Sequence, residues 1–480
     1  MARNPKLVWK SSAPEPLEMR SPSSPHLRRS PAFPLEVCEL VIDACKSLSS
    51  AEWDVTDTYS ALLACSLTCK AWQVRARRWL FYHVKIVSSI QFSKFLHVLA
   101  DHSFYGDFVR RLSIAINPEA PGPFLSAGIA IIMLTNKLRN LGRMDVMYTA
   151  VRPHDVFFAC IRRYNVLNIL SISGYAFKNI KHLVRCITSF PALDTLKIVQ
   201  DDYDPPTPSR FPLPLLHADI PKLTTIQIEI SQTEDGPCPS SPSTIFHLID
   251  WLNCSPVCRH LQKLWIVLTV ATDTDDYGTV RRINKLLTSC GESLRELAIT
   301  IQVSSDVGEP WRLDCLKGLT LRNNLELRHL NIFRLPWQTA TTVFATVLSE
   351  SSFIPTHLET ITLSFHTNEL WPDDVVTRSY NYSIFQNVDL ALSMEGKFSS
   401  LRKLVIDVSD TAADVKQRHA LRENLPRLVA RELVHLTEVD EDQLYVFDLS
   451  AIVSLLNRTF QPFTLELTMR SRSASCYQRI

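Results

Sequence analysis

The chain has 480 residues, of which 46% are hydrophobic and 21% are charged, as in an ordinary folded protein. This length exceeds what one compact core accommodates, so we expect two domains or an elongated array of repeats. The 51 basic and 49 acidic side chains leave a formal net charge of +2. Proteins that bind nucleic acid carry a strongly basic face, so this balance argues against a nucleic-acid partner.

The apolar runs and the cysteines bear on the cellular compartment. The longest apolar run, around residues 127–134, falls far short of the roughly 20 residues that span a bilayer, and the N-terminus lacks the apolar core of a secretory signal. The twelve cysteines are scattered through apolar segments, where a reduced cysteine behaves as a small core residue. We therefore expect a cytoplasmic or nuclear protein without a membrane partner.

The two ends of the chain lack periodic patterns. Residues 1–31 are rich in proline and serine, which predicts a disordered leader. Residues 466–480 are polar and predict a flexible tail.

Residues 32–85 predict a small all-α domain. Apolar residues form two stripes along residues 35–45, so this first helix has to be covered on more than one side. A loop then leads to Asp57, which we expect to cap a second helix over residues 59–68. A third segment, residues 69–84, ends the domain.

Three motifs in this domain, FPLEVCELVID, LLACSLTCKAW and WLFYHV, resemble in order and spacing an F-box domain of the divergent kind abundant in fungal proteins. The resemblance covers residues 33–84 and implies a three-helix unit that docks on the Skp adaptor of a cullin–RING ubiquitin ligase. Phe33 departs from the family, which usually has leucine before the proline, and the loop over residues 46–57 is longer than typical. The matching positions, which the resemblance implies bind the adaptor, are Pro34, Leu35, Val37, Leu40, Val41, Ile42, Leu62, Leu67, Cys69, Trp72, Leu80 and Phe81.

The size of the domain agrees with this interpretation. About 50 residues bury little surface, so a partner or a neighbouring domain is expected to complete the core. The alternative is that the three helices only cap the first repeat of the domain that follows.

Residues 105–465 repeat one short phrase, which is an apolar residue, two variable ones, an apolar, one variable and an apolar. The alternation in its last three positions predicts a half-buried strand. The ten copies are 109-112-114, 141-144-146, 167-170-172, 193-196-198, 223-226-228, 261-264-266, 294-297-299, 327-330-332, 358-361-363 and 401-404-406.

Apolar stripes at helical spacing lie between the copies, over residues 180–187, 245–252, 280–287 and 343–348. A strand and a helix that alternate at this period indicate an α/β solenoid of leucine-rich repeats. The repeats are irregular because they lack the regular asparagine after each strand. The alternative is a doubly wound α/β sheet.

Sequence motifs of catalysis and metal binding are missing. No two of the eleven glycines lie closer than six residues and no histidine precedes a glutamate, which excludes GxGxxG, GxSxG, the P-loop and HExxH. Cys65/Cys69 and Cys254/Cys258 lie four apart without the CxxC pairs of zinc ribbons. We therefore expect a non-catalytic protein without metal or cofactor, although these motifs do not test a site assembled from distant residues.

Substrate contacts are expected on the strand positions that point away from the helices. Trp265 and Phe333 are the preferred anchors because large aromatic residues dominate protein interfaces, and Glu229 and Asp407 lie on the same face. The alternative is that an insertion loop covers both rings.

These expectations combine into one function, the substrate-recognition subunit of an SCF-type ubiquitin ligase, which binds a protein substrate on its repeats. A leucine-rich-repeat scaffold that binds no adaptor is the main alternative. A catalytic solenoid is a more distant one.

Overall fold

The computed structural model divides the chain into two units, Met1–Leu80 and Phe81–Ile480. It describes residues 35–47, 56–115, 127–146, 155–173, 180–200, 221–230, 244–270, 277–303, 319–336, 356–366, 384–394, 396–407, 419 and 421–437. Within these ranges, no helix combines the length and apolarity needed to cross a membrane. The expected leader and tail lie outside the described residues, as do residues 343–348.

The first unit contains three helices, α1 (Leu35–Ser47), α2 (Thr56–Thr68) and α3 (Lys70–Leu80). Their core consists of Ile42, Leu62, Cys65 and Ala76, against which Trp72, Trp79, Leu80 and Cys45 pack. Helix α2 begins one residue before Asp57, so the expected cap at this position is corrected.

A charged network ties α3 to α1. The Arg75 guanidinium donates to both carboxylate oxygens of Asp43, from Nε at 3.0 Å and Nη2 at 2.6 Å, and pairs with Glu39 at 2.7 Å. The Trp79 indole Nε1 also donates to Asp43 Oδ1, at 2.7 Å. A bidentate pair fixes direction as well as distance, so these bonds orient α3 on α1.

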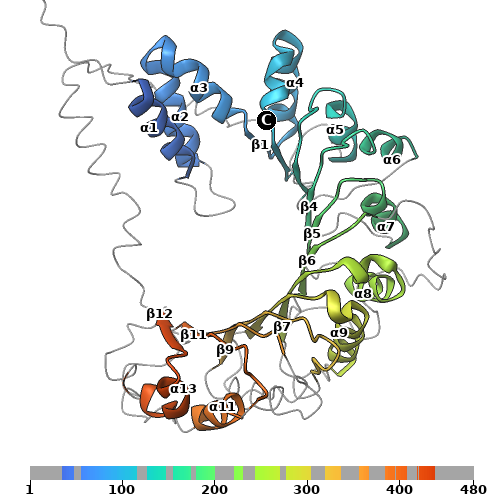
Figure 1. The fold of residues 1–480 in the computed structure, drawn as a ribbon. Coiled ribbons are helices and arrows are strands. Elements are labelled where there is room, and N and C mark those ends of the chain that lie inside the picture. Colours follow the sequence, from blue (N-terminus) through green and yellow to red (C-terminus); the bar gives the residue numbers. More distant parts are fainter. Residues whose placement is uncertain are drawn as a thin grey trace, which may run out of the picture. The chain divides into compact units, whose positions relative to one another are not determined.

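The second unit contains a sheet of twelve strands, in which every neighbouring pair is parallel and the spatial order follows the sequence (Figure 1). A doubly wound sheet reverses its strand order at a switch point, so that alternative is excluded, and the strand order is compatible with a solenoid-like arrangement. The strands are β1 (His83–Ile86), β2 (Arg111–Ile114), β3 (Arg143–Val146), β4 (Ile169–Ser173), β5 (Thr195–Gln200), β6 (Thr225–Ile230), β7 (Lys263–Val270), β8 (Glu296–Val303), β9 (His329–Pro336), β10 (Thr360–His366), β11 (Lys403–Asp407) and β12 (Val434–Thr437).

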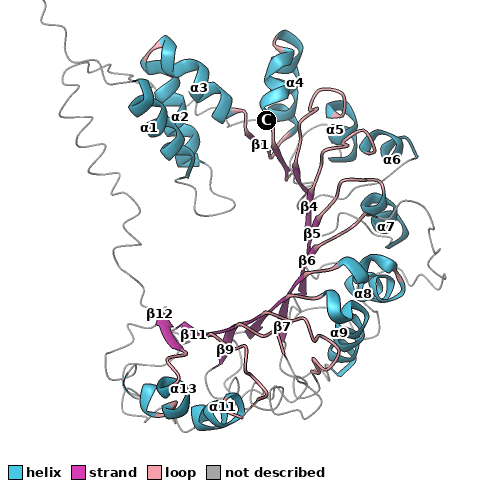
Figure 2. Ribbon diagram, viewed as in Figure 1, coloured by secondary structure: helices cyan, strands magenta, loops and turns pink. Residues whose placement is uncertain are grey.

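Within the second unit, helices and 3-10 turns are described in most of the connections between consecutive strands. They lie along one face of the sheet, and the other face carries none of the described helices of this unit (Figure 2). They are α4 (Ser89–Asp101), η1 (Ser103–Phe108), α5 (Ala127–Leu134), α6 (Asp155–Ile161), α7 (Ile180–Thr188), α8 (Thr244–Cys254), η2 (Pro256–His260), α9 (Tyr277–Cys290), η3 (Gly291–Ser293), α11 (Ile384–Leu392) and α13 (Pro426–Ala430). We call the helix-free side the open face.

The ten copies of the phrase coincide with β2 to β11, and their apolar positions align in register. The last position, for example, forms a row of isoleucines through Ile198, Ile228, Ile266 and Ile299, all buried. Each fully buried aliphatic side chain contributes about 1.5–3 kcal/mol. These rows therefore hold each strand and its helix against the neighbouring repeats.

A hydrogen-bond ladder precedes the strands. The carbonyl of the residue just before one strand accepts two successive N–H groups at the start of the next strand. For example, Thr224 O accepts from Gln262 N at 2.8 Å and from Lys263 N at 2.9 Å. The same pattern occurs at Tyr82, Arg110, Gly142, Asn168, Asp194, Gln262, Arg295, Arg328 and Glu359. It fixes the register between consecutive strands from β1 to β11.

The sheet extends beyond the ten copies at both ends. The residues Phe81, Val84 and Ile86 at strand β1 have the spacing of the phrase. The repeats therefore begin before residue 105. Helix α3 ends at Leu80 rather than near residue 84. The first two positions of this copy, Phe81 and Val84, lie within the third F-box-like motif. At the other end, β12 has Arg431 at the first apolar position, and its guanidinium donates to the carbonyls of Leu392 and Phe398.

The helical stripes over 180–187, 245–252 and 280–287 correspond to α7, α8 and α9, with their apolar residues buried. Helix α9 ends before Gly291, whose φ of +52° places it in the left-handed region that favours glycine.

Substitution of Gly106 tests how closely the first repeats pack. A Cβ at this position would lie 2.1 Å from Lys137 O, whereas one at Gly142 would have Asn168 Oδ1 at 3.5 Å as its nearest neighbour. We expect Gly106→Ala to lower the free energy of unfolding by about 1–3 kcal/mol, because a backbone carbonyl has to move. Urea denaturation measures the change. Gly142→Ala is the matched control, and an equal effect of both substitutions would contradict this packing.

Candidate protein-binding surfaces

The helical unit exposes large apolar side chains on all three of its helices. Leu40 on α1 is 68% exposed, Leu67 on α2 is 77% exposed and Val74 on α3 is 73% exposed, and Val37 and Leu63 are also exposed. Helices that only served their own core would turn such residues inward. The exposed apolar residues Val37, Leu40, Leu63, Leu67 and Val74 are therefore a candidate docking surface.

The residues matched to the F-box motifs divide between this surface and the core. Val37, Leu40, Leu67 and Cys69 are exposed, Val41 is half-buried, Ile42 and Leu62 are buried core residues, and Trp72 and Leu80 pack against that core. Leu35 is the first residue of α1, and Pro34 lies outside the described residues. The motifs did not single out Leu63 or Val74, although the spacing of Leu63 to Leu67 places these two residues on one face of α2.

Phe81 lies in the second unit. Its ring stacks on that of Tyr105, with centroids 4.3 Å apart and planes 15° from parallel. It packs against the core of the repeats, as the first apolar position of the phrase does in later repeats.

Trp265 and Phe333 come together on the open face although β8 lies between their strands. Their ring centroids are 6.2 Å apart and tilted by 39°. Trp265 is opposite Ala298 in the register, and Phe333 is opposite Thr300. The small Ala298 leaves room for the indole to lean across β8, where Nε1 donates to Thr300 Oγ1 at 3.1 Å. We call Trp265, Ala298, Thr300 and Phe333 the aromatic patch.

The aromatic patch retains accessible surface. Trp265 is 42% exposed, whereas Ala298 and Thr300 beneath it are each 6% exposed. An indole that is held by a hydrogen bond and remains accessible has the properties of an interface anchor, because little conformational entropy is left to lose on binding.

The two acidic residues expected on this face lie at different distances from the patch. Glu229 on β6 is half-buried and in register with Val267, one strand from Trp265. Asp407 is the last residue of β11, opposite Ser364 of β10, so β10 separates its strand from that of Phe333. The structure thus brings Glu229 beside the aromatic patch and leaves Asp407 further along the sheet.

A buried polar cluster lies on strands β1 to β3. Asp145 is fully buried and accepts hydrogen bonds from Arg111 Nε at 2.8 Å, Arg143 Nε at 2.9 Å and Ser113 Oγ at 2.9 Å. Ser113 Oγ is also 2.8 Å from His83 Nε2. The sequence analysis did not identify this cluster, because the pairing of its residues depends on the register between strands.

This cluster is built for structure rather than nucleophilic catalysis. A catalytic triad places the histidine between the nucleophile and the carboxylate, whereas here Ser113 lies between His83 and Asp145. Ser113 is also only 1% exposed, so a substrate carbonyl has no access to its hydroxyl. The arrangement neutralises Asp145 with two guanidinium groups and leaves His83 in a desolvated, positively charged neighbourhood.

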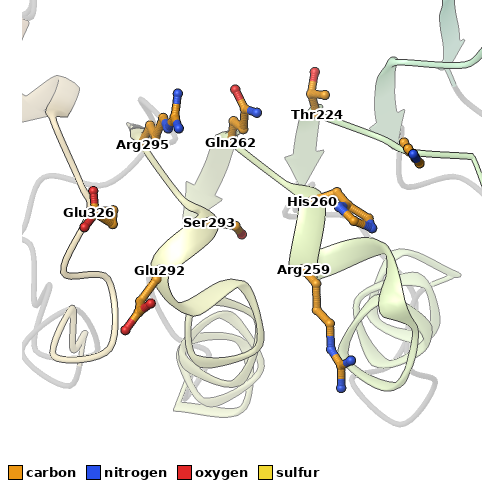
Figure 3. Close-up of a pocket in the computed structure, with 9 residues that line it drawn as sticks. Thr224, Arg259, His260, Gln262, Glu292, Ser293, Arg295 and Glu326 are labelled. Carbon is orange, nitrogen blue, oxygen red and sulfur yellow. The ribbon is translucent and has the colours of Figure 1, made fainter.

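A shallow hollow of about 530 Å³ lies where β6, β7 and β8 begin (Figure 3). Its lining includes Arg259, Arg295, Glu292 and Glu326. The figure shows Arg295 and Gln262 pointing away from Arg259 and Glu292. A small-molecule site needs polar groups that converge on the ligand, and these groups diverge, so the hollow supports no ligand assignment.

The described residues contain no group of three or more histidine, cysteine, aspartate or glutamate side chains that could hold a metal ion. Neither a family model nor a curated protein matches the chain. Any functional assignment therefore depends on the surfaces described above.

The polar cluster makes the stability of the fold depend on pH. Desolvation, followed by the charge of Arg111, lowers the pKa of His83 from 6.5 to about 4. Below pH 6.5 the unfolded chain therefore binds a proton that the folded chain does not bind, so this residue makes the fold less stable as the pH falls from about 6.5 towards 4. His83→Gln should reduce the loss of stability between pH 7 and pH 5, as measured by urea denaturation.

The control for this prediction is His435→Gln, which removes an exposed histidine of β12. It should leave the pH dependence as in the unmodified chain. If His83→Gln also left it unchanged, the desolvated environment of His83 would be refuted.

Proposed function

We propose that this chain is the substrate-recognition subunit of an SCF-type ubiquitin ligase. The helical unit docks on the Skp adaptor, and the open face of the repeats binds a protein substrate. The observation that carries the proposal is the exposure of large apolar side chains, Leu40, Leu67 and Val74 among them, on a unit with only five buried hydrophobic residues among those described. Such surfaces mark protein interaction sites.

The way in which the F-box-like motifs divide their residues between core and surface supports the choice of partner. The first two motifs supply both the core of the unit, through Ile42 and Leu62, and its exposed apolar residues, through Leu40 and Leu67. This division is what a docking domain requires, because one set of residues maintains the fold while another remains available to the adaptor.

The mechanism is positioning. The adaptor and cullin hold the chain near the ubiquitin-charged enzyme, and the open face holds the substrate. This arrangement raises the effective concentration of the substrate at the enzyme that transfers ubiquitin. The chemistry belongs to the other subunits. On the open face, the aromatic patch supplies the apolar anchor and Glu229 supplies a carboxylate one strand away.

One observation favours the second candidate, a repeat scaffold without a ligase role. Phe81 and Val84 of the third F-box-like motif belong to the first repeat, where Phe81 stacks on Tyr105 and both pack against the repeat core. In this alternative, the helices serve as an N-terminal cap of the repeats.

Adaptor binding separates the two candidates. We expect the unmodified chain to co-purify with the Skp adaptor, and Leu40→Asp combined with Leu67→Asp to reduce the adaptor yield at least tenfold. A carboxylate in an apolar interface loses its hydration, and about 1.4 kcal/mol already changes affinity tenfold. The yield is measured by quantitative mass spectrometry.

Ser60→Asp is the matched control for this experiment, because it introduces the same charge at an exposed polar position of α2. It should leave the adaptor yield unchanged, and thermal melting should show all variants to be folded. Wild-type adaptor yield from the double variant, or no adaptor binding by the unmodified chain, would refute the docking proposal.

Substrate capture tests the aromatic patch. Trp265→Ala combined with Phe333→Ala should retain the adaptor and lose proteins that the unmodified chain enriches when ubiquitin transfer is blocked, because truncated aromatic anchors typically cost 2 kcal/mol or more in binding. Lys285→Ala, at an exposed position of α9 and therefore away from the open face, is the control. A large fall in melting temperature of the double variant would instead assign both rings to the fold.

A further inference from the structure

The open face of strands β1 to β5 carries an excess of positive charge. Side chains along a strand point alternately to the two faces of a sheet, so the residues between the buried ones belong to the open face. The charged residues at these positions are the cationic Lys85, Arg111, Arg143 and Lys197 and the anionic Asp145. Four positive charges and one negative charge leave a net charge of +3 on the described strands of this region. We call Lys85, Arg111, Arg143 and Lys197 the basic region.

Asp145 holds the two arginines of the basic region in place. Arg111 and Arg143 are directly opposite each other on β2 and β3, where like charges repel. The buried carboxylate accepts a hydrogen bond from Nε of each arginine, at 2.8 Å and 2.9 Å. One guanidinium is enough to balance one buried carboxylate, so the second adds a positive charge beyond this requirement. The two arginine side chains remain 18% and 19% exposed, so they are ordered and still accessible from the solvent.

The positive charge acts on His83, which is opposite Arg111 in the register. After the larger effect of desolvation, Arg111 lowers the pKa of His83, and Arg143 and Lys85 lower it further. Asp145 opposes these charges, but by less than Arg111 alone. The electrostatic field at this position is therefore positive, although Asp145 lies within the cluster.

The basic region ends where the open face becomes acidic. Glu229 lies on β6 and Glu296 lies on β8, and Lys263 between them pairs with Glu296 at 2.7 Å. The excess of positive charge is therefore a local property of the face and does not follow from the formal net charge of the chain, which is +2.

The dimensions of the basic region favour an acidic protein segment as its ligand. Lys85 and Lys197 lie at the two ends of one register row. Neighbouring strands are about 4.8 Å apart, so the row from β1 to β5 spans about 19 Å, the length of about six residues of an extended chain. Guanidinium groups bind carboxylates through charge-assisted hydrogen bonds. A nucleic acid would need a basic surface that continues along its phosphate backbone, whereas this one ends beside Glu229.

We propose that the basic region binds a segment of about six residues, rich in aspartate and glutamate, on a partner protein. The carboxylates of the segment contact the two arginines at the centre of the region and the two lysines at its ends. The complementary charge offsets the repulsion between the four cations and speeds the encounter of the two proteins. This inference rests on the part of the proposed function in which the open face binds a protein, and it does not depend on adaptor docking.

The test measures peptide binding to the full-length chain by fluorescence anisotropy at pH 7. The probe is a fluorescein-labelled peptide of about eight glutamates, and the reference is the same peptide with glutamine at every position. The glutamate peptide should bind at least about tenfold more tightly. An increase from about 50 to about 300 mM sodium chloride should weaken its binding, because salt screens exposed charges.

Lys85→Glu combined with Lys197→Glu reverses two charges of the basic region and retains the hydrogen bonds of Asp145. The glutamate peptide should bind to this variant at least about tenfold more weakly. Lys94→Glu combined with Lys285→Glu is the matched control, because it makes the same change of net charge at exposed positions of α4 and α9. Thermal melting should show both variants to be folded.

Arg111→Gln tests the contribution of the arginines. Arg143 still neutralises Asp145 in this variant, so the chain should fold, and the glutamate peptide should bind at least about threefold more weakly. Binding as tight as that of the unmodified chain would overturn the role of the arginines.

Three results would overturn the proposal as a whole. They are equal binding of the glutamate and glutamine peptides, unchanged binding by the lysine variant, and an equal loss of binding in its control. If a single-stranded DNA of about ten nucleotides bound more tightly than the glutamate peptide, the region would be assigned to nucleic acid instead. None of these results changes the expected co-purification with the Skp adaptor, so this inference and the proposed function fail separately.

Discussion

The carbonyl that precedes each strand from β1 to β10 is the constraint on which the repeat unit depends. Each such oxygen accepts two N–H groups from the start of the next strand, in the pattern illustrated by Thr224 O with Gln262 and Lys263. Two donors on one oxygen leave no freedom for a strand to slide by one residue, which would turn its apolar side chains to the open face. The register of the buried rows, the position of the helices and the composition of the open face all follow from this bond.

The repeated strands and helices could be predicted from the sequence because their apolar residues recur periodically. Ten copies of the phrase gave ten strands, and stripes such as Ile245 to Leu252 gave helices on one side of the sheet. The missed strands, β1 and β12, have local reasons. The first copy, at Phe81, was included in another motif, and the last has Arg431 in an apolar position. An arginine there is tolerated because its guanidinium reaches two backbone carbonyls.

The candidate surfaces could be predicted from the sequence only in part. Alternation along a strand placed Trp265 and Phe333 on one face, but their approach depends on Ala298, a small residue on the intervening strand. The polar cluster around Asp145 likewise arises from pairings between strands. Local spacing along the chain carries no information about such contacts.

The buried carboxylate of Asp145 also gives the array a starting point. Strands that share one apolar phrase are nearly interchangeable, so a folding chain has the opportunity to pair a strand with the wrong neighbour. Asp145 on β3 is satisfied beside Arg111 of the preceding strand, and removing the partner of a buried ion pair costs about 3–5 kcal/mol. The charge pair therefore makes the pairing of β3 with β2 specific. This pairing fixes the order of strands near the N-terminal end of the sheet, and the remaining repeats add to it in sequence.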